Sequence, residues 1–113
     1  MKNSRVVLAV ESLLAETVID EWAKRLEARP SPPHDLRKPR IEEVGKCSVV
    51  RWDWAPLTEK DIYDLIGVCE LLVCPYEIMV VGDRALDDVR YWHGTLELPV
   101  QLMARVEVKA RIR

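Results

Sequence analysis

A strict alternation of apolar and polar side chains from Leu96 to Ile112 constrains this chain more than any other feature. Every even position in this range is aliphatic, and most odd positions are charged or polar. A period of two is typical of β-strands with one buried and one solvated face. A single strand of this length would far exceed the usual length of about 5–6 residues. We therefore expect the chain to turn or bend, with a bulge or break at Pro99.

Residues 4–28 are predicted to form an amphipathic helix. Their apolar side chains recur every three or four positions and so share one face: Val7, Val10, Leu14, Val18, Trp22 and Leu26. Asp20 and Lys24 form an acid-before-base pair four residues apart, which supports a helix. The β-branched run Arg5–Val10 leaves a second interpretation open, in which it is a short strand and the helix begins near Ser12.

The segment Pro30–Arg40 contains four prolines and no apolar periodicity. This composition predicts a polyproline-type or mobile loop. The preceding helix cannot bury its apolar face alone, so we expect the loop to lie within a single domain that spans residues 1–113.

The middle of the chain predicts a strand, a helix and a second strand. Lys46–Trp54 alternates in polarity as a strand does. Thr58, with Asp61 three residues later, has the spacing of a helix-capping box. Glu77–Val81 is a short apolar strand. The helix between the strands has a stripe of apolar side chains: Ile62, Leu65, Ile66, Cys69 and Leu72.

These elements together predict one small α+β domain. At 113 residues and 49% apolar side chains, the chain has enough material for one core and too little for two. We expect the N-terminal amphipathic helix and the second helix to pack on a mixed or antiparallel sheet of about four strands. A long alternating strand or hairpin would follow at the C-terminal side.

Charge and cysteine usage bear on compartment and partners. The net charge of −2 argues against a generally polycationic nucleic-acid binder. Three is an odd number of cysteines, which argues against a disulfide framework and favours a reducing compartment. The apolar run Val6–Val10 is interrupted by Glu11, and no cleavage site for a secretory signal follows it. No apolar stretch is long enough to cross a bilayer, so we expect a cytoplasmic protein with no membrane contact.

Signatures of catalysis are weak. The four glycines are isolated, so no phosphate-binding loop can be built. Cys47, Cys69 and Cys74 lack the paired spacing of structural zinc sites. We therefore expect no cofactor and no metal, and we favour a non-enzymatic protein over an enzyme.

A short triplet supports the third-ranked hypothesis, a small metal-dependent nuclease. Glu107-Val108-Lys109 resembles the Glu-x-Lys element of the PD-(D/E)xK nucleases. That resemblance implies a carboxylate that helps to hold a divalent metal ion and a lysine that polarises water or phosphate. Asp83, Asp87 or Asp88 would supply the upstream carboxylate. A triplet this short also arises by chance, and the other interpretation is a solvated strand face.

The leading hypothesis is a non-enzymatic protein-binding module, an inhibitor or adaptor of the phage or mobile-element accessory type. Tryptophan, tyrosine and arginine dominate the energetics of protein interfaces, and the chain gathers them near residue 90. A strand edge would pair with another protein or with a second copy of the chain. The candidate protein-binding residues are Asp87, Asp88, Arg90, Tyr91, Trp92 and His93.

The second hypothesis is a nucleic-acid-associated protein that uses a basic face of the C-terminal strand. Clustered cations bind phosphates, and such binding weakens steeply with salt. Two groups of residues are candidates, on the strand and in the loop: Arg105, Lys109, Arg111 and Arg113, with Arg37, Lys38 and Arg40.

Overall fold

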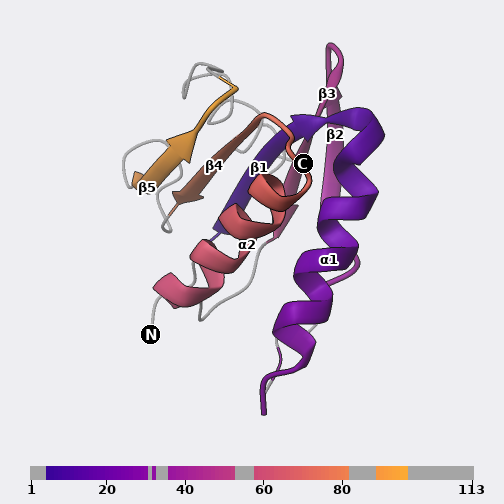
Figure 1. Ribbon diagram of the computed structural model, residues 1–113. Helices are drawn as coiled ribbons and strands as arrows, with labels where there is room; N and C mark the ends of the chain where they lie inside the picture. The colour runs from indigo at the N-terminus through magenta and orange to yellow at the C-terminus, as the bar shows by residue number, and fades with distance from the viewer. Residues whose placement is uncertain (1–4, 31, 33–35, 53–57, 82–88, 97–113) are drawn as a thin grey trace.

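The computed structural model describes residues 5–30, 32, 36–52, 58–81 and 89–96 (Figure 1). In this part of the chain, five antiparallel strands form one sheet in the order β2-β3-β1-β4-β5, and both helices lie on the same face of it. The predicted α+β class is thus confirmed, with five strands rather than about four. The elements in chain order are β1 (Arg5–Glu11), the 3-10 turn η1 (Ser12–Leu14), α1 (Ala15–Glu27), β2 (Arg40–Val44), β3 (Cys47–Trp52), α2 (Glu59–Leu71), β4 (Tyr76–Val81) and β5 (Val89–Gly94).

The N-terminal run is the central strand β1, so the prediction of one helix over residues 4–28 is wrong at its start. The second interpretation, a strand followed by a helix, matches the structure. Val6 pairs with Trp52 of β3 and with Val80 of β4, and all five residues from Val6 to Val10 are buried. A strand that is covered on both faces shows a continuous apolar run instead of alternation, and such a run also fits a helical stripe.

The β2–β3 hairpin begins at Arg40, the last residue of the predicted loop. Gly45 and Lys46 form a two-residue connection between Val44 and Cys47. Gly45 has φ of +63°, which suits the first central position of a type II′ turn. Strand β3 confirms the strand predicted at Lys46–Trp54, whereas β2 was not predicted. Strand β2 thus starts at the end of the predicted loop, and Arg37 before it binds Asp20 and Glu27 of α1.

Two tryptophans join the helices to the sheet. The rings of Trp22 on α1 and Trp52 on β3 are buried and meet edge to face, with centroids 4.8 Å apart. Trp22 Nε1 donates a hydrogen bond to the Asp61 carbonyl at 2.9 Å, and Trp52 Nε1 donates to the Leu36 carbonyl at 2.9 Å. A buried indole N–H needs such a partner. These two bonds fix the start of α2 and the chain that leads into β2.

Helix α2 begins with the predicted capping box. Thr58 Oγ1 accepts from the Asp61 amide, and the Asp61 carboxylate accepts from the Thr58 amide at 2.9 Å. Arg29 Nη1 lies 2.8 Å from Asp61 Oδ2. The predicted stripe is confirmed, because four of its five members are buried and Leu72 packs partly buried against the core.

The sheet face opposite the helices carries a second buried cluster. Its members are Val7, Ala9, Val49, Met79 and Val81, with Val44 and Leu96 packed partly buried against them. Arg51 and Glu77 are also buried, and both make polar contacts. The predicted alternation beyond Leu96 and the bulge at Pro99 lie outside the described residues.

Candidate functional site

The predicted aromatic and cationic cluster falls on β5. His93 pairs with Ile78 of β4 in the register of the sheet. Its ring is exposed, and Nδ1 lies 2.7 Å from the Tyr76 hydroxyl. The backbone of Arg90, Tyr91 and Trp92 belongs to the same strand, but their side chains are not among the described ones. Asp87 and Asp88 also lie outside the described residues, and so do the nuclease candidates Asp83, Glu107 and Lys109.

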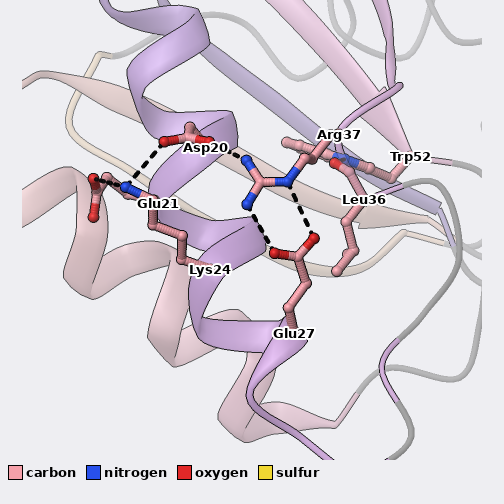
Figure 2. Close-up of polar contacts among 7 residues, drawn as sticks. All are labelled: Asp20, Glu21, Lys24, Glu27, Leu36, Arg37 and Trp52. Atoms are coloured by element: carbon pink, nitrogen blue, oxygen red, sulfur yellow. Dashed lines mark hydrogen bonds and ion pairs between the residues drawn. The ribbon is translucent and has the colours of Figure 1, made fainter.

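The predicted basic surface is only partly described, and Arg37 in it is already bound to carboxylates (Figure 2). Arg37 donates to Glu27 through Nη2 at 2.8 Å and through Nε at 3.1 Å, and it also donates to Asp20. These bonds raise the pKa of Arg37 above its usual value. Lys38 is exposed, and Arg40 is exposed at the start of β2. Arg105, Lys109, Arg111 and Arg113 lie outside the described residues.

Asp20 is the junction of the ion pairs on α1. Lys24 Nζ lies 3.2 Å from Asp20 Oδ2, and Arg37 binds the other oxygen. The hydrogen bond from Lys24 lowers the pKa of Asp20 most, and the hydrogen bond from Arg37 lowers it further. The same Lys24 bond raises the pKa of Lys24. Arg37 thereby ties the segment before β2 to α1 at two points, one at Asp20 and one at Glu27.

A cavity of about 400 Å³ opens between α1 and the start of β2. We call it the β2 groove. Of its apolar lining residues, Ile19 is buried and Ile41 is exposed, with 46% of its surface accessible. The lining thus combines apolar side chains with three charged ones, those of Glu16, Asp20 and Arg37, which we call the rim of the groove. Its lining residues are Glu16, Ile19, Asp20, Arg37, Pro39 and Ile41.

Strand β2 lies at one edge of the described sheet. The two-residue turn makes Val44 and Cys47 the closing hydrogen-bonded pair, and hydrogen-bonded pairs then alternate along an antiparallel ladder. Ile41 and Glu43 consequently direct their backbone N–H and C=O groups away from β3. Both residues are exposed. Their side chains share the helix-covered face with the β2 groove, because Ile41 pairs with Val50 of the core.

A hydroxyl and carboxylate cluster fixes the far end of β2. Ser12 Oγ donates to Glu43 Oε2 at 2.6 Å, and Ser48 Oγ lies 3.0 Å from both Glu43 Oε1 and Ser12 Oγ. The Ser12 amide also donates to the Lys46 carbonyl at 3.0 Å. These bonds join η1 to the hairpin. They position Glu43 but bring no imidazole or amine to either serine that would activate it as a nucleophile.

The thiols do not form an activated site among the described residues. Cys69 and Cys74 are buried, and Cys74 Sγ donates to the Cys69 carbonyl at 3.5 Å. Burial raises the pKa of both thiols, so both stay protonated and unreactive near neutral pH. Cys47 is half-buried on β3. In the described part of the chain, no three histidine, cysteine or acidic side chains are arranged to hold a metal ion.

No protein-family model, curated protein or solved structure matches this chain. No helix in the described ranges is long and apolar enough to cross a membrane. The cytoplasmic location stays a prediction.

The residues of the β2 groove were not identified from sequence. Glu16 and Ile19 look like ordinary members of an amphipathic helix, and their meeting with Ile41 depends on the tertiary fold. One local signal was present. The stretch Arg40–Val44 just before Gly45 is mostly charged, with Ile41 and Val44 as its two aliphatic residues, which is typical of an exposed edge strand that leads into a tight turn.

Proposed function

We propose that this protein is a non-enzymatic protein-binding module that receives an extended segment of a partner protein at the outer edge of β2. The added segment forms a sixth strand beside the five that the structure describes. Main-chain hydrogen bonds to an exposed sheet edge provide affinity in this mode of recognition, and pockets for alternate side chains provide specificity. An inhibitor or adaptor needs only this binding activity.

One observation carries the proposal: an edge of the described sheet runs beside a groove of suitable chemistry. The backbone groups of Ile41 and Glu43 face outward, and the β2 groove lies on the face to which alternate side chains of an added strand would point. Protected edges usually carry charged residues pointing inward or are covered. On β2, the inward-facing charge is Glu43, which is bound by Ser12 and Ser48. The other inward-facing residue, Ile41, is apolar and exposed.

The site differs from the one predicted from sequence, which was centred on residues 87–93. No observation on the described residues favours nucleic-acid binding as a second function. The donors of Arg37 are engaged by carboxylates, and Arg40 also interacts with another residue.

Octapeptides displayed on phage and selected against the full chain would test the proposal. Recovered peptides would be synthesised and titrated against ¹⁵N-labelled protein. We expect the amide resonances of Ile41 and Glu43 to shift. We also expect Ile41→Pro to weaken binding at least about tenfold, because proline removes an outward N–H that β3 does not use.

Ile41→Ala is the matched control, because it shortens the same side chain and keeps the N–H. It should lose much less affinity than Ile41→Pro. Amide spectra would establish that both variants are folded. A folded Ile41→Pro variant that binds every recovered peptide as tightly as the wild type does would refute strand addition at β2.

A further inference from the structure

We infer that the segment received at β2 is basic, with a lysine or arginine placed against Glu16 and an aliphatic side chain two positions away placed against Ile19 and Ile41. This inference rests on the proposed strand addition and names the chemistry of its partner. It follows from two independent features of the β2 groove. One is the spacing of the side chains along α1 and β2, and the other is which of its charged side chains are already paired.

The spacing of side chains along one face of α1 matches the spacing of side chains along one face of an added strand. Glu16 and Asp20 are one helical turn apart, which is about 6 Å along the helix axis. Ile41 and Glu43 are two residues apart, which is about 6.6 Å along a strand. Helix α1 runs alongside β2 and β3 (Figure 1), and the Ser12–Glu43 bond places the start of α1 at the Glu43 end of β2.

Two groove-facing side chains of the added strand consequently meet different surroundings. The one opposite Glu43 lies at the Glu16 end of the groove. The one opposite Ile41 lies nearer to Ile19 and to Asp20, whose carboxylate is already paired with Lys24 and Arg37. A side chain with a long apolar stem and a cationic head suits the first position, and a branched aliphatic side chain suits the second.

The charges of the groove favour a cation over an anion. Its rim holds two carboxylates and one guanidinium, those of Glu16, Asp20 and Arg37. Arg37 already donates to Glu27 and Asp20, and Asp20 also pairs with Lys24. The Glu16 side chain makes no hydrogen bond or ion pair with any other residue in the described ranges. A ligand carboxylate would find no uncommitted cation on this rim, whereas a ligand cation would find Glu16.

The test uses two libraries of displayed octapeptides that differ only at a fixed fourth position, which is lysine in one and glutamate in the other. Position six is restricted to valine, isoleucine and leucine in both. We expect the lysine library to yield binders that Ile41→Pro weakens, and the glutamate library to yield far fewer. Glu16→Gln should weaken a recovered lysine peptide about two- to fivefold, as the loss of an exposed ion pair does.

Glu70→Gln is the matched control, because it removes the same charge from an exposed position on α2. It should leave the affinity unchanged. Peptides that are sensitive to Ile41→Pro but show no preference for lysine and no effect of Glu16→Gln would overturn this inference and leave the proposed function intact. If no peptide from either library is sensitive to Ile41→Pro, the proposed function itself falls.

A second copy of the chain is the competing occupant of the edge. Sedimentation velocity would detect it as a dimer that Ile41→Pro converts to monomer, and that result would also overturn the inference. A monomer at the concentrations used for the titrations supports a partner segment.

Discussion

Asp61→Ala is expected to destabilise the protein by about 2 kcal/mol, because one carboxylate serves both the cap of α2 and an ion pair with the end of α1. The Asp61 side chain is only 3% exposed. Its loss removes the acceptor for the Thr58 amide, which costs about 1 kcal/mol for a helix cap. It also removes the partner of Arg29. That charged hydrogen bond contributes about 1 kcal/mol after discounting, because the Arg29 side chain is 34% exposed.

Urea unfolding followed by tryptophan fluorescence would measure this loss. Trp22 reports on the site directly, since its indole N–H is bonded to the Asp61 carbonyl, which the substitution retains. For a urea slope of about 2 kcal/mol/M, the unfolding midpoint should fall by about 1 M with little change in slope. Asp61→Asn retains an acceptor for the Thr58 amide and loses the charge, so we expect it to cost about half as much.

Glu59→Ala provides the comparison that isolates the cap. Glu59 is an exposed acid in the same first turn of α2, and its removal loses only the favourable interaction with the helix dipole, about 0.5 kcal/mol. If Asp61→Ala and Glu59→Ala shift the unfolding free energy equally, the argument that Asp61 links α1 to α2 is refuted.

Two further substitutions and a labelling experiment test the sheet and the buried thiols. Gly94→Ala should destabilise by about 1–3 kcal/mol in the same urea assay, because its Cβ would lie 2.6 Å from the Tyr76 carbonyl oxygen and overlap the Glu77 carboxylate. Gly67→Ala should instead stabilise α2 by about 0.5–1 kcal/mol, because its Cβ would meet Arg25 Nη1 at an ordinary 3.5 Å. If both variants change the free energy of unfolding in the same direction, the packing inferred at Gly94 is contradicted. In the folded protein at pH 8, a disulfide reagent should modify Cys47 first, because burial raises the pKa of Cys69 and Cys74 and limits their thiolate fraction. Equally fast reaction of all three thiols without denaturant would contradict this expectation.

Local chemistry was sufficient to predict the middle of the fold. The spacing of Thr58 and Asp61 predicted the capping box, and the stripe after it predicted the buried face of α2. Strands β3 and β4 were identified because their ends coincide with turn residues and prolines. In each case the signal lies within about a dozen residues and does not depend on the rest of the chain.

Strand β1 shows where periodicity fails. Its apolar side chains face the helices on one side and the second buried cluster on the other. A fully buried strand has no polar face, so its sequence does not distinguish it from the start of a helical stripe. The assignment depends on the pairing of Val6 with both Trp52 and Val80, which joins segments more than 40 residues apart along the chain.

The β2 groove could not be predicted from sequence, because its lining residues meet only in the tertiary fold. Arg37 meets Asp20 and Glu27 across 17 and 10 residues of sequence. In the sequence, Arg37 was one of several cations available to a phosphate. In the structure, it is bound to two carboxylates, and the partner that we propose for this surface is a basic segment.

The contacts that hold β2 also explain why its edge is suited to binding. The segment before the strand is fixed by the Trp52–Leu36 bond and by the ion pairs of Arg37, and its far end is fixed by the serine bonds to Glu43. The groups that hold the two ends of β2 belong to α1, η1 and β3. The outward backbone groups of Ile41 and Glu43 take part in none of these bonds. An edge ordered in this way loses little conformational entropy when a strand is added, and a short segment can then bind with few contacts. Loosening the Arg37 anchor should therefore weaken peptide binding even though Arg37 itself need not touch the main chain of the ligand.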